Sequence, residues 1–597
     1  MYSQTVLAVE EYRQRLKDRE SRFAHYEKLH IRLGNIRLAL AAAAAWMAWE
    51  SIGRHAFSYW WIAVPAFVFA SVVAYHSRVL RARAMTQRGA FFYRIGIARI
   101  EDRWVGTGQT GDRFHDPHHV YAADLDLFGR GSLFELLSTA RTRMGEETLA
   151  KWLLSPSEVN QIEERHAAID ELRDQLDLRE DLAILGEDAS VSVYPEALLG
   201  WAEGPNQLNP PWLQWLVPIL VLAAVVGAVA WGYFGIATPF LLIVLIEAIM
   251  GYRLRKPREE VLHGSEKAFR HLDVLSGILA RIEQHTFRAP RLQSLQGELS
   301  SYQLEGSRAI ARLRTIVDLI DSRDNVIVRI LDVPLMYSVH VALAAERWRR
   351  AHGHAVRSWL SVIGEIEALI CLATYSYEHP DDSFPDFVQG SACFEATGIG
   401  HPLIPAAICI RNDVCLSDGR RVFLVSGSNM SGKSTLLRAI GLNTVLALAG
   451  APVCAVSLRL SRLSVCASLS VVDSLLNGKS KFMAEVDRLR QTLEAAAAGS
   501  PVLFLIDEIL SGTNSRDRRV AAEALVRTLV NRGAIGALST HDLAISEIAT
   551  LEELHGANVH MGSKDGGGPM DFDYLLKPGV TTEANALAIA RMAGVPV

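Results

Sequence analysis

The residue types and spacing most able to do chemistry lie at Gly427, Gly432, Lys433 and Ser434, which form the pattern G-x-x-x-x-G-K-S of a phosphate-binding loop. Glycine allows the tight backbone turn that brings N–H groups against phosphate oxygens. The Lys433 ammonium would bind the β- and γ-phosphates of ATP, and the Ser434 hydroxyl would ligate Mg²⁺. An ordinary strand-to-helix turn would explain the two glycines but not the Lys-Ser pair.

The elements around this loop have the order that a nucleotide site needs. Residues 422–425 are apolar and predict a buried strand that leads directly into the loop, which then opens a helix. The residues predicted to bind the nucleotide are Gly427, Ser428, Asn429, Met430, Ser431, Gly432, Lys433, Ser434 and Thr435.

Two carboxylates, Asp507 and Glu508, follow a second apolar run at residues 501–506. Parallel strands read as continuous apolar runs and ligands gather at their carboxyl ends, so these acids should lie close to the loop. Asp507 is predicted to hold Mg²⁺, and Glu508 to orient or deprotonate the attacking water. His541 follows a third apolar run, at 534–539, and is expected to sense the γ-phosphate. The predicted catalytic residues are therefore Glu508, Lys433 and His541.

The composition limits the classes of protein that fit. The chain has 597 residues, enough for several domains, and its hydrophobic fraction of 50% is high for a purely soluble protein. The net charge of −5 provides no overall basic field for nucleic acid, so any DNA contact must come from a local patch. The six cysteines have no C-x-x-C spacing and predict free thiols in a reducing compartment.

Two pairs of apolar stretches predict transmembrane helical hairpins. The first pair, 38–49 and 57–75, lies within residues 36–76, and the second, 212–231 and 237–250, within residues 206–252. Arginine and lysine flank both pairs, so the ends of each hairpin are expected in the cytoplasm. Together with the family resemblance described below, this topology leads us to expect a bacterial inner membrane. Glu247 near the end of the second pair could reach the interface or find a partner. A buried pair of soluble helices is the alternative for the first pair.

The remaining segments predict helices and one α/β domain. Residues 1–35 are a charged helical segment, 77–205 a soluble helical region, and 253–390 a long all-α core or lever domain. The fold class expected for residues 391–597 is an α/β P-loop ATPase with a parallel-rich sheet.

A basic cluster lies inside the helical region. The residues that could contact DNA phosphates are Arg347, Arg349, Arg350 and Arg357, with Trp348 among them. A solvated helix end around Gly353 explains the same residues at least as well.

Several motifs resemble those of the MutS family. The loop GSNMSGKST carries Asn429 and Met430, which match that family's P-loop and are not required by P-loops in general, although Ser428 and Ser431 stand where the family usually has Pro and Gly. Residues 480–485 resemble the family's signature loop, 507–508 and 512–515 its Walker B region, 539–541 its switch and 576–596 its closing segment. Residues 131–156 resemble the start of its core domain. The first 100 residues contain no Phe-x-Glu mismatch wedge.

The resemblance implies an Mg²⁺-dependent ATP hydrolase that works as a homodimer. In such a dimer, the loop carrying Ser480, Phe482 and Met483 would complete the nucleotide site of the partner chain. Hydrolysis would move the long helices.

Three functions fit these observations to different degrees. The first is a membrane-anchored MutS-like ATPase acting on mismatched, branched or recombining DNA. The second, which we rank as the runner-up, is a DNA-independent ATP switch that organises protein partners at the membrane. A transporter ATPase fits worst, because no LSGGQ-like helix start precedes Asp507 and the two hairpins offer few polar residues to line a path.

Overall fold

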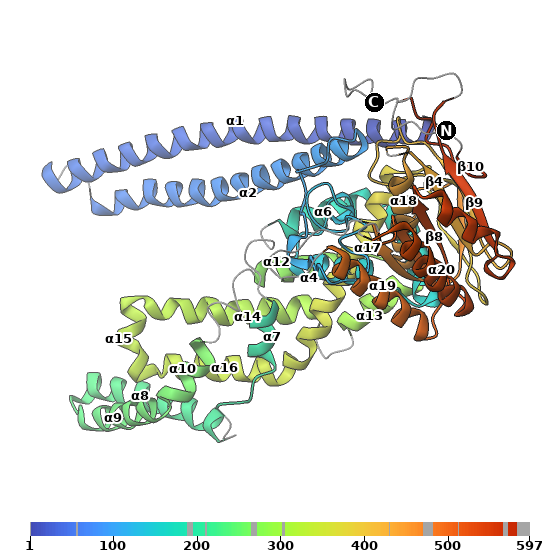
Figure 1. Ribbon diagram of the computed structural model, residues 1–597. Helices are drawn as coiled ribbons and strands as arrows, with labels where there is room; N and C mark the ends of the chain where they lie inside the picture. The colour runs from blue at the N-terminus through green and yellow to red at the C-terminus, as the bar shows by residue number, and fades with distance from the viewer. Residues whose placement is uncertain are drawn as a thin grey trace. The chain divides into compact units, whose positions relative to one another are not determined.

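The computed structural model describes residues 2–54, 58–187, 195–208, 212–263, 272–300, 305–428, 430–469, 481–510, 513–564 and 571–581. These form two compact units, and each is described by itself. Unit 1 comprises Met1–Leu137, Thr374–Ala447 and Ala451–Val597, and unit 2 comprises Ser138–Ala373 and Leu448–Gly450. Figure 1 shows the chain and labels many of its helices and strands.

A six-stranded sheet forms the centre of unit 1, with the strand order β10-β9-β4-β8-β7-β6. Strands β9, β4, β8, β7 and β6 run parallel, and β10 is antiparallel to β9. The bounds are β4 (Val422–Gly427), β6 (Ser464–Ser468), β7 (Val502–Asp507), β8 (Ile535–Thr540), β9 (Gly556–Met561) and β10 (Lys577–Pro578). The predicted parallel-rich α/β fold is confirmed.

The core of this sheet explains why the three apolar runs form adjacent strands. Strands β4, β7 and β8 are buried along their length except at Asp507, as expected where helices cover a parallel sheet. Helices α19 (Lys481–Ala497) and α20 (Ser515–Asn531) contribute apolar side chains to a buried cluster with Leu424 and Phe504. The polar residues that end these strands therefore meet at one edge of the sheet.

A smaller sheet with the order β1-β5-β2-β3 completes the strands of unit 1. Its members are β1 (Asp386–Phe387), β2 (Phe394–Ile399), β3 (Asn412–Leu416) and β5 (Ser457–Leu460). It positions the segment between β2 and β3 beside the P-loop.

Two long helices at the start of the chain pack against each other. Helix α1 (Tyr2–Arg54) runs without a break through the charged segment and the first apolar stretch, so the expected boundary at residue 35 is not a break between elements. Helix α2 (Ala63–Ile100) lies beside it, as Figure 1 shows, and Arg83 pairs with Glu27 across the contact. The pair is fixed within unit 1 by a buried ion pair, in which the Arg99 guanidinium donates to Glu378 at 2.6 and 2.7 Å.

Within the described residues, two helical segments are long and apolar enough to cross a membrane, namely Trp60–Ile100 and Leu213–Phe234. Each belongs to one of the predicted hairpins, but the other arms, the end of α1 and helix α9, do not meet this test in the described chain. A bent pair, Val328–Leu335 with Tyr337–Glu378, also passes. In its second arm, Trp359, Ile366 and Leu369 are buried inside the fold, so we assign that arm to the protein core, whereas the first arm is largely exposed.

In the described residues of unit 2 every regular element is a helix, as expected for a helical core. The expected domain at 253–390 has other bounds, because the residues from Thr374 onward belong to unit 1. The helices of unit 2 are α4 (Arg143–Leu154), α5 (Val159–Arg173), α6 (Leu176–Gly186), α7 (Pro195–Ala202), α8 (Leu213–Phe234), α9 (Thr238–Arg253), α10 (Arg255–His263), α12 (Leu272–Glu283), α13 (Pro290–Ser300), α14 (Gly306–Asp321), α15 (Val326–Leu335), α16 (Tyr337–His352) and most of α17 (Val356–Glu378).

A buried carboxylate holds the start of α4 in unit 2. Glu367 of α17 accepts hydrogen bonds from the backbone N–H groups of Arg141 and Thr142 and from the Thr142 hydroxyl. A Cβ at Gly145 would lie 2.3 Å from Glu367 Oε2, so glycine is required for this close approach. Burial raises the pKa of Glu367 to about 7 despite these donors.

Candidate nucleotide-binding site

The P-loop connects the end of β4 to the first turn of α18 (Lys433–Ala449). Its glycines adopt conformations that a side chain would not allow. Gly427 has φ +154° and a Cβ there would lie 2.5 Å from the Met561 carbonyl oxygen, while Gly432 has φ +100°. Met430 also has a positive φ, of +70°. Asn429 lies outside the described residues.

Lys433 is folded back into the loop. Its side chain is 5% exposed, and Nζ donates to the Gly427 and Ser428 carbonyl oxygens at 3.0 and 2.9 Å. Burial lowers the pKa of Lys433, while the neighbouring carboxylates Asp507 and Glu508 act in the opposite direction. An anionic ligand would compensate this buried ammonium, as a triphosphate does in P-loop proteins.

Two loop hydroxyls in the described part of the chain are buried without a hydrogen-bond partner. They belong to Ser428 and Ser431, the positions at which the loop departs from the MutS pattern. Buried polar groups are normally satisfied, so these two oxygens indicate space for a polar ligand. The loop residues therefore fit a bound polyphosphate.

The predicted Mg²⁺ ligands lie next to each other. The Ser434 hydroxyl donates to Asp507 Oδ2 at 2.5 Å, and the Ser539 hydroxyl donates to the other oxygen of the same carboxylate. A hydroxyl and a carboxylate oxygen at the phosphate end of the loop are the ligand types that Mg²⁺ takes in P-loop sites. Ser434 and Asp507 therefore fit the metal, and Ser539, which the sequence placed in the switch-like motif, orients the Asp507 carboxylate.

The three predicted catalytic residues come together at the ends of β4, β7 and β8. His541 Nε2 lies 2.7 Å from Glu508 Oε1 and 3.5 Å from Lys433 Nζ. A carboxylate only accepts, so the Nε2–H of His541 donates to Glu508 and the Lys433 approach is not a hydrogen bond. Glu508 has φ +49°, and its backbone N–H donates to the Ser539 carbonyl oxygen at 3.2 Å. Glu508 and His541 are partly exposed and can reach water.

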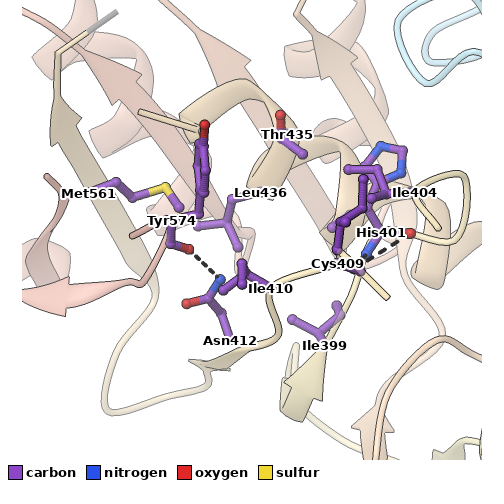
Figure 2. A pocket seen from close by; sticks show the side chains of 13 residues that line it. Ile399, His401, Ile404, Cys409, Ile410, Asn412, Thr435, Leu436, Met561 and Tyr574 are labelled. Atoms are coloured by element: carbon purple, nitrogen blue, oxygen red, sulfur yellow. Dashed lines mark hydrogen bonds between the residues drawn. The ribbon is translucent and has the colours of Figure 1, made fainter. Parts of the chain in front are cut away.

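A cavity of about 340 Å³ adjoins the P-loop and is shown in Figure 2. Thr435 lies on its lining, and the other side chains are largely apolar: Ile399, Ile404, Ile408, Ile410, Leu436, Ala439, Met561 and Tyr574, with His401, Cys409 and Asn412. Burial, together with Arg438, lowers the pKa of His401 to about 4, so its ring is neutral at pH 7. An apolar cavity beside a phosphate loop suits a flat nucleobase.

Sequence reasoning missed most of this cavity. Asn412 Nδ2 donates to the Tyr574 carbonyl oxygen at 3.1 Å, and Asn412 Oδ1 accepts from the Leu576 N–H at 2.7 Å. These contacts join segments more than 150 residues apart in the chain, and apolar lining residues look like core residues in a sequence. Of the residues that line it, Gly432 and Thr435 are among the predicted nucleotide-binding residues.

Comparison with known proteins agrees with this geometry. A family model for MutS domain V matches residues 423–597, and one for MutS domain III matches residues 121–189. These two segments of the chain are similar to domains of the MutS family. Both candidate membrane-crossing helices lie outside the two matched segments.

Individual MutS relatives match a limited part of their own length. The DNA mismatch repair protein MutS of Lactobacillus delbrueckii subsp. bulgaricus is 33% identical over 204 residues, 33% of this chain and 23% of that protein. The MutS of Lactobacillus johnsonii is 30% identical over 249 residues, covering 40% of this chain and 28% of that protein. DNA mismatch repair protein MSH3 of Phaeosphaeria nodorum is 31% identical over 252 residues, covering 40% of this chain and 22% of that protein. The chain thus spans about a quarter of the length of these relatives.

The MutS-like signature loop is described only from Lys481 onward, so Ser480 lies outside the described residues, as does Gly512. Phe482 and Met483 begin α19 and are 42% and 47% exposed. The Glu485 carboxylate, one turn further on, is buried and accepts from the Leu510 N–H, two residues after Glu508. The structure therefore links the start of α19 directly to the segment that follows the predicted base. The closing segment from Thr582 onward is also outside the described residues.

The basic cluster predicted to contact DNA lies within unit 2 and is largely engaged there. Arg349 is buried, pairs with Glu346 at 2.5 Å and donates to the Pro205 carbonyl oxygen. Arg357 makes two hydrogen bonds of 2.8 Å to Glu203, and Arg350 donates to the Leu208 carbonyl oxygen. Arg347 is exposed. The alternative of a structural helix end accounts for most of the cluster, and DNA contact through it stays a prediction.

Proposed function

We propose that the protein is a membrane-anchored MutS-family ATPase that couples Mg²⁺-dependent ATP hydrolysis to conformational change. The observation that carries this proposal is the meeting of Lys433, Asp507, Glu508 and His541 at the ends of three adjacent parallel strands. MutS domain V, which matches this region, supports it. The nucleotide-binding residues are those of the loop, 427–435.

The bound nucleotide with Mg²⁺ supplies the phosphoanhydride bond and a Lewis acid. This chain supplies the rest. The loop N–H groups and Lys433 bind and orient the phosphates, and Ser434 and Asp507 hold the metal. Glu508 accepts a proton from the attacking water at its carboxylate, and His541 orients that carboxylate through Nε2. The apolar cavity beside Thr435 binds the base.

We propose that two chains act together. Phe482 and Met483 are exposed apolar residues at the start of a helix that contacts the segment after Glu508. In a homodimer they would complete the partner's nucleotide site together with Ser480. Closure of that site would then change the position of α19 and of the Glu508 carboxylate at the same time.

We infer that the conformational change acts on DNA, namely on mismatched, branched or recombining duplex. The support is the likeness to three proteins whose names describe DNA mismatch repair. A second function, a DNA-independent switch that organises protein partners, is favoured by a specific observation. Arg349, Arg350 and Arg357 of the predicted DNA-binding cluster are engaged by residues of this same chain rather than presented to a nucleic acid.

Membrane attachment is the remaining element of the proposal. Helix α8 is 22 residues long and exposes large apolar side chains such as Trp215 and Leu222, which are 77% and 64% exposed. In α2 and the turn before it, Trp60 and Phe67 are 85% and 74% exposed. Surfaces of this kind suit lipid better than water. Both hairpins would anchor the ATPase on the cytoplasmic face of the membrane.

ATPase turnover of the purified full chain in detergent or lipid nanodiscs tests the proposal. The rate is measured with no DNA, with matched duplex, with mismatched duplex and with a four-way junction, at several salt concentrations. A Mg²⁺-dependent rate that a DNA structure stimulates, with stimulation that weakens as salt rises, is expected. Turnover that is indifferent to every DNA would favour the protein switch, and no turnover in any condition would refute the ATPase assignment.

A further inference from the structure

A buried carboxylate in α9 has no partner in the part of the chain that the structure describes. Glu247 is 1% exposed, and neither Oε1 nor Oε2 makes a hydrogen bond there. An ionised carboxylate is costly to bury without compensation, so such a group carries a proton or meets a ligand. In a helix beside a membrane-crossing segment, an unpaired acid indicates function.

A cavity of about 360 Å³ opens beside Glu247 within unit 2. Helices α9, α10, α15 and α16 line it, and the chain bends by 76° between α15 and α16, where Met336 has φ +45°. Its lining residues are Glu247, Ala248, Gly251, Tyr252, Arg255, Arg258, Glu259, Asp332, Val333, Met336 and Val339. The volume is in the range of small-molecule sites.

Most charged groups of this cavity already have partners. Both Asp332 oxygens accept hydrogen bonds from Ser338, one from the backbone N–H at 2.7 Å and one from the hydroxyl at 2.9 Å. Arg255 Nε donates to Glu259 at 2.9 Å.

Arg258 is the exception among the basic groups. Its Nε is buried without a partner in the described chain, and burial lowers the pKa of Arg258, with Asp332 acting against that shift. The cavity therefore presents one unsatisfied acceptor group, Glu247, and one unsatisfied donor, Arg258. A ligand that carries both an ammonium and an anionic group would satisfy the two.

The surroundings of the cavity are apolar and exposed. On α15, Val326 and Ile330 are each 69% exposed. On α9, the exposed apolar residues are Leu241, Leu242, Leu245, Ile246 and Ile249. A charged ligand held here would lie among surfaces suited to hydrocarbon chains, which is the situation of a phospholipid headgroup.

We propose that this cavity binds the headgroup of an amine-bearing phospholipid, with its ammonium at Glu247 and its phosphate at Arg258. The inference rests on the proposed membrane attachment of α8 and α9. It adds that the protein selects its lipid, because phosphatidylethanolamine offers N–H donors to Glu247 whereas phosphatidylcholine carries a methylated nitrogen with none.

Native mass spectrometry of the purified full chain in detergent tests the proposal. The probes are phosphatidylethanolamine, its N-methyl and N,N-dimethyl derivatives and phosphatidylcholine, all with the same acyl chains. We expect about tenfold tighter binding of phosphatidylethanolamine than of phosphatidylcholine, a difference that one charge-assisted hydrogen bond can provide, with intermediate affinity for the methylated lipids. Equal binding across the four lipids would overturn the proposal.

Variants separate the cavity from general lipid adhesion. Glu247→Gln keeps the side-chain shape and should abolish the preference, and Arg258→Gln should weaken binding of all four lipids. Glu260→Gln removes an exposed charge on the same helix as Arg258, outside the cavity. It should change neither the preference among the lipids nor the affinity for them. A preference that survives Glu247→Gln would refute the role of Glu247. If a variant does not fold, the comparison of lipids on the unaltered chain still decides.

Flotation distinguishes this inference from the proposed anchoring. If the chain floats with phosphatidylcholine vesicles but shows no preference among the four lipids, the proposed membrane anchor stands and the proposed headgroup site is refuted. If the chain floats with no vesicles, both proposals are refuted.

Discussion

His541 Nε2 lies 2.7 Å from Glu508 Oε1, so the predicted base and the predicted γ-phosphate sensor are hydrogen-bonded to each other. The two residues follow adjacent strands, β7 and β8, whose parallel register places Asp507 opposite Ser539. The Glu508 backbone has φ +49°, a conformation that is uncommon outside glycine. Strained backbone at such a position is typical of functional sites, because the surrounding structure must hold it.

Replacing Glu508 by Gln should reduce kcat about 10²–10⁴-fold while ATP affinity stays within a few-fold, because the amide cannot accept the proton from water. Single-turnover hydrolysis and equilibrium binding of ATP measure the two effects. Glu494→Gln is the control, since Glu494 is an exposed member of an i,i+4 ion pair on α19 that contributes little. Unchanged turnover in Glu508→Gln would remove Glu508 from the role of base.

His541→Ala should lower kcat by acting through Glu508, and its effect should largely disappear in the Glu508→Gln background. The physical reason is that a residue which orients a carboxylate has nothing left to orient when the carboxylate is gone. The four rates of the double-mutant cycle measure the coupling, with KM for ATP followed in each. Additive losses would indicate that His541 contacts the nucleotide independently of Glu508.

Most of the nucleotide site could be predicted from the sequence, because its motifs are local in the chain. The P-loop spacing and the apolar runs that end in Asp507 and His541 each occupy a few consecutive residues, and parallel strands bring their ends together. The base cavity could not be predicted, because Asn412 and Tyr574 meet only after the chain folds. The internal pairing of the basic cluster could not be predicted for the same reason, since nothing near Arg357 in sequence shows that Glu203 pairs with it. The continuity of α1 across residue 35 is likewise a property of the folded chain.

Unit 2 should become less stable as the pH rises from about 5 to about 7, and Glu367→Gln should remove this dependence. Burial raises the pKa of Glu367 from 4.5 to about 7, so between these values the folded chain holds a proton that the unfolded chain has lost. The stabilising contribution is thus complete below 4.5 and is lost as the pH passes 7. Its size is on the order of 3 kcal/mol.

Thermal unfolding at intervals from pH 5 to pH 8 measures this slope for the unaltered chain and for Glu367→Gln. Glu163→Gln, an exposed carboxylate on α5 in the same unit, is the control and should keep the slope. A slope that is the same in all three proteins would show that Glu367 titrates alike in the folded and unfolded chain.

Mixing two inactive variants tests whether the signature loop acts on the partner chain. Lys433→Ala removes the phosphate-binding ammonium but keeps the loop, and Phe482→Asp alters the loop but keeps the P-loop. If the loop acts in trans, a mixed dimer contains one intact composite site, and the mixture should recover a substantial part of the turnover that neither variant shows alone. Lys564→Ala, an exposed lysine far from the P-loop in sequence, is the control for charge loss and should retain full activity. No recovery in the mixture, with dimers present, would place the loop and the P-loop of one site on the same chain.

The turn between α8 and α9 should lie outside the cytoplasm. Helix α8 has 22 residues, about 33 Å at the usual rise, which spans the roughly 30 Å hydrocarbon core. Helix α9 has 16 residues, about 24 Å, so its return requires local thinning of the bilayer or Arg253 reaching toward the headgroups. A reporter that is active only outside the cytoplasm should therefore be active when inserted after Gly235 and inactive after Arg255, with insertion after Lys564 as the cytoplasmic control. Activity at none of these positions would mean that the α8–α9 pair does not cross the membrane. The proposed anchor would then consist of α1 and α2 alone. Insertion of the same reporter after Arg54 tests whether the turn between those two helices lies outside the cytoplasm.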